Sequence, residues 1–216
     1  MTLQPHRTNL PVIGLAAVML LAVDGARADD SEEAARFLTE LSQQAVEKLT
    51  DATASEEEKE QRFRDLMETS FDLPRIGKFV LGVNWRRASP EQRQNFIDAF
   101  EDVQVKRFLP MFAGYSDESL LVTKVRQDQK RPELFFVGSK IQRPQGETYF
   151  VEWRLRRRAD RYKILDVATE GVSMAVTLRN EYGSVAKTHG IDGLIARLRD
   201  KADQKTPSTA ATAENQ

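Results

Sequence analysis

The residues that most often do chemistry in proteins are scarce in this sequence. Its 216 residues include two histidines and no cysteine. His189 stands beside Gly190 in "KTHGID", a pattern typical of a helix end, where a cationic side chain is favoured by the helix dipole. The other histidine, His6, lies in the N-terminal segment expected to be removed, so a nucleophilic triad would have only His189 as its base, and too few ligands remain for the usual zinc sites. The sequence also has no glycine-rich phosphate loop. We therefore predict no catalytic residue, no metal and no cofactor.

Two charged features remain as candidates. Asp166 interrupts the apolar run "YKILDVATEG", and a buried carboxylate there needs a partner. A structural ion pair with a nearby arginine is the favoured interpretation, and an acid or base in a hydrophobic substrate pocket is the alternative. The other feature is the basic cluster in "RLRRRADR", which comprises Arg154, Arg156, Arg157, Arg158 and Arg161.

The basic cluster has two interpretations. It is either the solvated face and tip of a hairpin, or a surface that attracts anionic headgroups or an acidic partner protein. Arg154 and Arg156 are the candidate contacts for a headgroup or partner. A protein that uses only this cluster, as an adaptor between proteins, is a further possibility.

The stretch "YFVEWRL" contains the clearest apolar pattern. Tyr149, Val151, Trp153 and Leu155 alternate with mainly polar residues, which predicts a strand with one apolar face. That face covers either an ordinary core or a cavity for an apolar ligand. Because the polar inventory is poor, an apolar cavity is the most plausible kind of site.

The elements that position these residues follow from spacing and caps. Ser55 with Glu58, and Ser89 with Gln92, predict two helix starts. Asp72 and Gly82 predict the start and end of a third helix. Helices are expected over residues 30–49, 55–71, 72–82, 88–115, 173–190 and 191–202, and strands over residues 119–125, 133–141, 148–155 and 161–169. Four strands joined by short turns predict an antiparallel sheet, and the order of elements predicts an α+β domain in which helices cover the apolar face.

The N-terminus has the features of an export signal. His6 and Arg7 precede the apolar run 10–23, and Ala26-Arg27-Ala28 fits a cleavage site. We expect a signal peptide over 1–28, a folded domain over 29–204 and a disordered tail over 205–216, with an uncleaved anchor as the alternative to cleavage. Basic and acidic residues nearly balance, at 32 and 33, so no nucleic-acid partner is expected.

Three segments resemble the MlaC-type periplasmic phospholipid-binding family, also known for toluene tolerance. The first is 71–100, with Leu81-Gly82, Trp85-Arg86 and the helix start at Ser89. The second is "YKILDVATEGVSM" and the third is "GIDGLIARL". Phe108 stands where the family often has Tyr, and family members also occur beside hopanoid-synthesis genes. A hopanoid is therefore the alternative cargo.

The resemblance implies a curved antiparallel sheet wrapped by N- and C-terminal helices, with an apolar cavity between them. It implies a periplasmic carrier, not an enzyme, that shuttles phospholipid between the membranes and maintains outer-membrane asymmetry. The implied partners are an outer-membrane lipoprotein-porin complex and an inner-membrane ABC transporter. The residues expected to line the cavity are Phe79, Phe100, Val103, Phe108, Tyr149, Val151, Trp153, Leu155, Val167, Val172, Met174 and Leu178.

Overall fold

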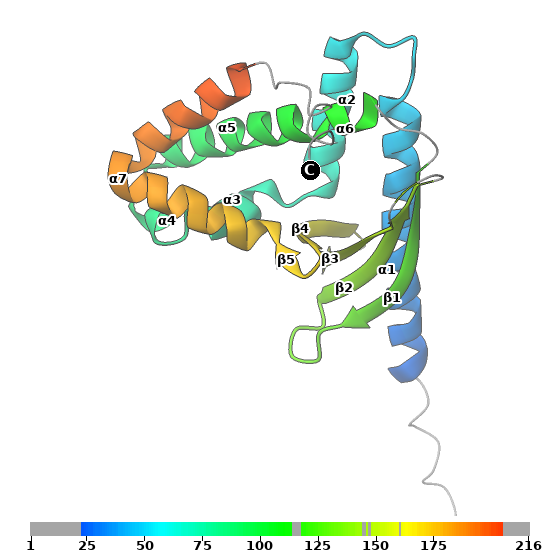
Figure 1. The fold of residues 1–216 in the computed structure, drawn as a ribbon. Helices are drawn as coiled ribbons and strands as arrows, with labels where there is room; N and C mark the ends of the chain where they lie inside the picture. The colour runs from blue at the N-terminus through cyan, green and yellow to red at the C-terminus, as the bar shows by residue number, and fades with distance from the viewer. Residues whose placement is uncertain (1–22, 114–117, 144–145, 147, 160, 205–216) are drawn as a thin grey trace, which may run out of the picture.

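A layer of helices stands beside an antiparallel sheet in the computed structural model of the protein (Figure 1). The structure describes residues 23–113, 118–143, 146, 148–159 and 161–204. The helices are α1 (Val23–Leu49), α2 (Glu56–Ser70), α3 (Leu73–Leu81), α4 (Val83–Arg87), α5 (Pro90–Phe108), α6 (Pro110–Ala113) and α7 (Met174–Asp203). The strands are β1 (Ser119–Gln127), β2 (Leu134–Gln142), β3 (Tyr149–Arg158), β4 (Arg161–Thr169) and β5 (Val172–Ser173).

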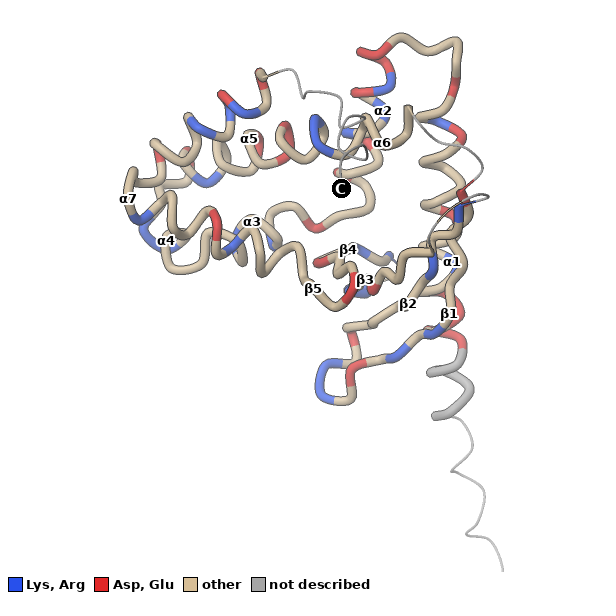
Figure 2. The backbone as a smooth tube through the Cα atoms, viewed as in Figure 1, with Lys and Arg blue, Asp and Glu red and all other residues tan. Residues whose placement is uncertain are grey.

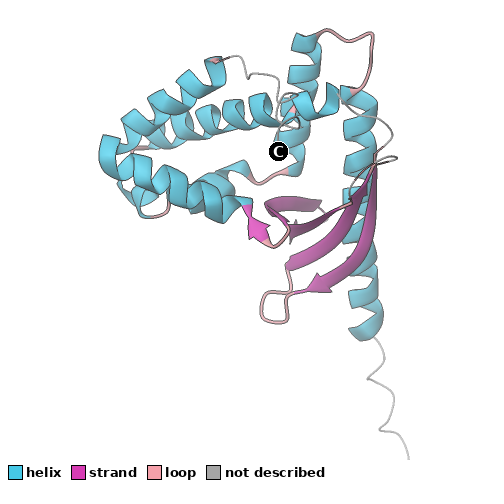
Figure 3. Ribbon diagram, viewed as in Figure 1, coloured by secondary structure: helices cyan, strands magenta, loops and turns pink. Residues whose placement is uncertain are grey.

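The predicted α+β class is confirmed, with one strand more than the four expected. The five strands form an open sheet in the order β1-β2-β3-β4-β5, and every neighbouring pair is antiparallel. The added strand, β5, has two residues and leads directly into α7 (Figure 3). Residues 1–22 of the predicted signal peptide and the predicted tail lie outside the described residues. No helix in the described part of the chain has both the length and the apolarity needed to cross a bilayer.

The predicted helix starts are confirmed because they depend on local hydrogen bonds. The Ser55 hydroxyl accepts from the Glu58 amide while the Glu58 carboxylate accepts from the Ser55 amide, at 3.2 and 2.8 Å. The same reciprocal pair joins Ser89 and Gln92, at 3.0 and 3.1 Å. Asp72 accepts from the Arg75 amide at 3.2 Å to begin α3. Each such cap is worth about 1 kcal/mol of stability.

Two long helical stretches differ from the prediction in detail. The stretch predicted over 88–115 divides into α5 and α6 at Pro110, which has no backbone N–H to donate. The two C-terminal helices expected to meet near residue 190 are the two halves of α7. They are joined at Gly190, whose φ of 73° interrupts the helix. After this kink, α7 turns back along α5 (Figure 1).

The pairing of the strands divides the sheet into two faces. Extra residues at Thr123 in β1 and at Leu165 in β4 form bulges, which shift the side-chain alternation of those strands by one residue. The face that packs on α1 is called the inner face. It carries Leu120, Val122, Val125, Phe135, Val137, Ser139, Ile141, Tyr149, Val151, Trp153, Leu155, Tyr162, Ile164 and Val167. The opposite side is called the outer face.

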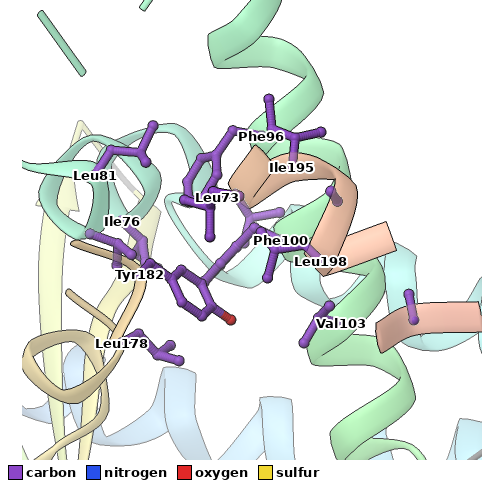
Figure 4. Close-up of a cluster of buried hydrophobic side chains, with 14 of the residues drawn as sticks. Leu73, Ile76, Leu81, Phe96, Phe100, Val103, Leu178, Tyr182, Ile195 and Leu198 are labelled. Atoms are coloured by element: carbon purple, nitrogen blue, oxygen red, sulfur yellow. The ribbon is translucent and has the colours of Figure 1, made fainter. Parts of the chain in front are cut away.

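The molecule has two hydrophobic cores. In the sheet core, Ala34 and Leu38 of α1 pack on Phe135, Leu155 and neighbours of the inner face. In the helical core, side chains from α3, α5 and α7 converge (Figure 4), and Tyr182 stands edge-on to the rings of Phe96 and Phe100 at 6.3 Å.

Phe71, at the junction of α2 and α3, packs against both cores. The chain beside it runs along β4, where the Asp72 amide donates to the Ile164 carbonyl at 3.0 Å. The two layers are therefore joined along the edge of β4, while each retains a core of its own.

Candidate functional site

The inner face of the sheet is buried at one end and open at the other. Phe135, Leu155 and Ile164 lie side by side on neighbouring strands, and each is 0% exposed. Toward the opposite ends of these strands the inner-face side chains become partly exposed. We call these partly exposed residues the open end; they are Leu120, Val122, Val125, Ile141, Tyr149, Trp153 and Val167.

The helices explain why one end is open. α1 lies along β1 and β2, whereas α2, α3 and α7 lie against β4, on the other side of β3. Ala34, Phe37, Leu38 and Leu41 of α1 pack into the sheet core, which covers Phe135 and Leu155 completely and leaves the side chains toward Leu120 and Tyr149 partly exposed. Water in contact with the uncovered apolar surface costs about 25 cal/mol per Å². The open end is therefore a place where an apolar ligand would be stabilised.

The indole of Trp153 and the neighbouring Ser139 hydroxyl form hydrogen bonds within the sheet. The Trp153 indole N–H donates to the Ser139 hydroxyl at 2.9 Å, and that hydroxyl donates to the Val151 carbonyl at 3.3 Å. The described residues of the inner face include no buried side-chain polar atom without a partner. This surface suits hydrocarbon, and the Arg143 guanidinium lies beside it, 5.4 Å from the Tyr149 ring.

The predicted lining residues fall into three groups. Tyr149, Val151, Trp153, Leu155 and Val167 share the inner face, as the alternating pattern predicted for β3. Phe100, Val103 and Leu178 lie instead inside the helical core, with Met174 packed against it. Phe108 is partly exposed at the end of α5, with the Arg107 guanidinium 5.3 Å from its ring.

Phe79 and Val172 are placed away from both cores. Phe79 is 40% exposed and lies under the Arg179 guanidinium, 4.9 Å from its ring, because it occupies the solvent side of α3. Val172 is 64% exposed at the edge of the sheet in β5. The structure does not bring these two residues to the inner face.

The expected apolar cavity is not among the hollows that stand out in the described structure. One hollow of about 430 Å³ is lined by Glu47, Lys48, Asp51, Arg62 and Asp65. Another, of about 240 Å³, is lined by Glu68, Phe71, Asp72, Pro74, Arg156, Arg158, Arg161 and Lys163. Both have mainly charged walls. The candidate apolar site here is therefore the partly covered inner face of the sheet.

Asp166 has a structural role with other partners than predicted. Its carboxylate accepts from the amides of Val167 and Ala175, both at 2.9 Å, and from the Ser173 hydroxyl at 2.5 Å. The predicted arginine partner is wrong, because the bulge in β4 turns Asp166 toward the start of α7, where amide donors are free. Asp166 thus joins β4 to α7.

Arg154 and Arg156 lie on the outer face, opposite the apolar side chains of β3. The Arg154 guanidinium lies 5.9 Å from the Phe136 ring, and Arg156 is 3.8 Å from the Asp72 carboxylate. Of the predicted cluster, Arg157 alone turns to the inner side, where it pairs with Asp30 of α1. A lipid held on the inner face would therefore not meet Arg154 or Arg156 directly.

The remaining titratable groups do not form an acid-base site. Burial raises the pKa of Tyr162 and of Tyr182 to about 12, so both phenols stay neutral at ordinary pH. His189 is exposed at the kink of α7, where its Nε2 lies 3.1 Å from an Arg197 nitrogen. Among the described residues, no group of His, Asp or Glu is arranged to hold a metal ion.

Sequence reasoning missed half of the open end. Leu120, Val122, Val125 and Ile141 come from β1 and β2, which were predicted as strands but not as walls of the site. The signal was present, since Leu120 and Val122 alternate as the residues of β3 do. The bulge at Thr123 hides the continuation of the pattern to Val125.

These features define a class of α+β protein in which an open antiparallel meander, flanked by helices, keeps one apolar face partly uncovered. Residues 39–200 match the sequence model of the family described as MlaC protein. The chain belongs to the MlaC family, as its three motifs predicted.

Individual relatives agree with this assignment. The chain is 24% identical over 139 residues to the intermembrane phospholipid transport system binding protein MlaC of Haemophilus influenzae, a match that covers 62% of this chain and 63% of that protein. It is 26% identical over 154 residues to toluene tolerance protein ttg2D of Pseudomonas putida, covering 64% and 68%.

A solved structure shows the same fold. The phospholipid-binding protein from Ralstonia solanacearum, determined in complex with a phospholipid, superposes with a TM-score of 0.62 at 19% sequence identity. The match covers 86% of this chain and 98% of that one. The sheet and flanking helices predicted from the sequence thus form a known architecture.

Proposed function

We propose that this protein is a periplasmic carrier that binds phospholipid through its acyl chains at the open end of the inner face. Membership of the MlaC family supports the assignment, and one structural observation carries it. Leu120, Ile141 and Tyr149 pair in the last row of the inner face and are partly exposed, although Phe135, Val137 and Val151 on the same face are buried.

The energetic reason for such a carrier is the cost of moving a lipid through water. Each methylene transferred to water costs about 0.8 kcal/mol, so two acyl chains create a barrier on the order of 20 kcal/mol. A partly exposed apolar face lowers that barrier by covering the chains. The headgroup stays outside, because the inner-face side chains of the open end are uncharged.

A bound lipid needs more room than the open end alone provides. The helical and sheet layers have separate cores joined through Phe71 and the edge of β4. Displacement of one layer from the other would therefore preserve most of the buried surface within each. We propose that the acyl chains enter between the layers and contact Tyr149, Val151, Trp153, Leu155 and Val167 on the sheet side. Contact with Phe100, Val103, Phe108, Met174 and Leu178 on the helical side would also require the helical core to open.

The proposed route runs between an outer-membrane lipoprotein-porin complex and an inner-membrane ABC transporter, and maintains outer-membrane lipid asymmetry. The name of the Haemophilus influenzae relative, an intermembrane phospholipid transport protein, supports this proposal. The direction of lipid transport would be set by these partners if they bind the loaded and empty forms of the carrier with different affinity. A partner shifts the equilibrium between two forms only by the difference in its affinity for them.

The direct test is solvent extraction and mass spectrometry of the protein purified from its native periplasm. We expect phospholipid bound to the wild type. Absence of any lipid would overturn the proposal, and a bound hopanoid would replace phospholipid as the cargo.

A matched pair of variants tests the placement of the site. Val122→Asp puts a carboxylate into the open end, whereas Val83→Asp makes the same change at a residue that is 56% exposed on α4. We expect Val122→Asp to lose its lipid and Val83→Asp to keep it, with both folded by circular dichroism. If Val122→Asp does not fold, Val122→Asn is the milder substitute. Retained lipid in a folded Val122 variant would place the site elsewhere.

A further inference from the structure

The outer face of the sheet is strongly basic, although the whole chain has a net charge of −1. Strand pairing places eight basic side chains on this face, and the acidic residues that its described strands contribute are Glu152 and Asp166. Figure 2 marks the charged positions along the backbone. Asp166 is already engaged by Ser173 and the start of α7. The basic residues are Lys124, Arg126, Lys140, Arg154, Arg156, Arg158, Arg161 and Lys163.

Apolar groups lie among these charges. The Arg126 guanidinium is 4.1 Å from the Phe136 ring, and the Lys140 ammonium is 5.4 Å from the Phe150 ring. Leu121, Lys140 and Phe150 pair in one row across β1, β2 and β3. Leu121 is 54% and Phe150 is 52% exposed. The face therefore combines cations with exposed hydrocarbon.

The basic character continues into a hollow at the edge of the face. The hollow of about 240 Å³ includes Arg156, Arg158, Arg161 and Lys163 in its walls. Lys163 donates to the last carbonyls of α2, those of Glu68 and Thr69, at 2.8 and 2.6 Å. Arg156 keeps a buried Nε without a partner. Arg156 and Lys163 are thus held mainly by groups of the protein, and the exposed Arg158 and Arg161 carry the basic character of this edge.

From these observations we infer that the outer face docks the protein on an anionic lipid bilayer. Charge complementarity selects an anionic partner, and each Lys or Arg near such a surface adds to the attraction. An acidic protein would satisfy the charges, but it gives no reason for the exposed Leu121 and Phe150. A bilayer accepts both, because its headgroups bind the cations while its interface accepts apolar side chains.

This inference goes beyond carriage of lipid and does not depend on it. The docking surface and the open end lie on opposite faces of the sheet. A molecule lying on a membrane by its outer face would keep its inner face available to cargo.

Flotation with vesicles tests the proposal, using the full chain purified from the periplasm. We expect binding to vesicles of phosphatidylcholine mixed with phosphatidylglycerol, little binding to phosphatidylcholine alone, and release as salt rises, because exposed charges are screened within about 10 Å at 0.1 M salt. The double variant Lys124→Gln/Arg126→Gln should bind about 30-fold more weakly, since each residue contributes about one kilocalorie per mole.

The matched control is Arg86→Gln/Arg87→Gln, which removes two exposed arginines of α4 and the same net charge. We expect this control to bind as the wild type does. Equal weakening in both double variants, or no wild-type binding to phosphatidylglycerol vesicles, would overturn the docking surface. Bound lipid is measured on the same samples, so failure of docking with cargo present is distinct from failure of the carrier function.

Discussion

Replacement of Asp166 by alanine should loosen the connection between the sheet and α7. Asp166 accepts three hydrogen bonds at this junction, from the Val167 and Ala175 amides and from the Ser173 hydroxyl. Hydrogen bonds to a charged group contribute about 1.5–3 kcal/mol each, but they are not additive, and water replaces some of them in the variant. The carboxylate also lies at the N-terminus of α7, where an anion adds about 0.3–1 kcal/mol.

A loss of about 2–4 kcal/mol in the free energy of unfolding follows from these terms. For a domain of this size, each kilocalorie per mole lowers Tm by about 2–4 °C, so we expect a fall of about 4–16 °C in thermal unfolding followed by circular dichroism. Asp166→Asn should fall less, because the amide oxygen can still accept from the two backbone amides.

The control is Asp203→Asn at the exposed end of α7, which should leave Tm almost unchanged. An unchanged Tm in Asp166→Ala would refute the structural role. Asp166 also separates carrier from enzyme, because a carrier variant that remains folded should keep its bound lipid. Loss of a catalytic turnover with intact stability would instead support the hydrophobic-pocket enzyme.

Three further predictions concern the cores and the kink. Leu155→Ala removes most of a side chain that is 0% exposed and should lower the free energy of unfolding by about 2–5 kcal/mol, measured by urea titration. A loss of less than about 1 kcal/mol would contradict tight packing around Leu155. Burial raises the pKa of the Glu101 carboxyl above its ordinary 4.5. The folded protein therefore binds this proton more tightly than the unfolded chain does, and the free energy of unfolding falls as pH rises from 4.5 through the raised pKa. Glu101→Gln should therefore be more stable than wild type at neutral pH and depend less on pH between acid and neutral; an unchanged pH profile would refute this. Gly190→Ala should cost about 1–3 kcal/mol from backbone strain, because a φ of 73° with a ψ of −179° is a conformation that essentially only glycine adopts. Nothing lies within 4 Å of an added methyl group, so an unchanged Tm would argue against the kink.

The sequence predicted the elements whose signals are local. The helix starts at Ser55, Asp72 and Ser89 depend on side chains within three residues of the amides they cap. The strand expected over 161–169 coincides with β4. The short elements α4 and β5 were missed, because they have too few residues to show a period.

The arrangement of the site was predicted only in part, for a physical reason. An alternating pattern identifies the apolar face of β3, but not which helix covers it or how far. Phe100, Val103 and Leu178 were assigned to the same cavity as Val151 because all are apolar. The structure places those three in a separate core, because α3, α5 and α7 pack mainly on one another. That choice is made by contacts between residues far apart in the sequence.

The bulges at Thr123 and Leu165 explain two remaining differences from the prediction: the inner-face residues of β1 that were missed, and the arginine partner expected for Asp166. In β4, Tyr162 and Ile164 share the inner face with Val167, because the extra residue at Leu165 changes the alternation between them. A regular strand would have placed Asp166 among the apolar side chains, which is why an arginine partner was expected for it. β3 keeps a regular alternation, so its odd-numbered residues from Tyr149 to Leu155 supply apolar side chains while Arg154, Arg156 and Arg158 supply the basic face. A slip of β3 by one residue would turn those arginines into the sheet core and the apolar side chains into water. The same register that buries Leu155 therefore fixes both the proposed lipid surface and the proposed docking surface.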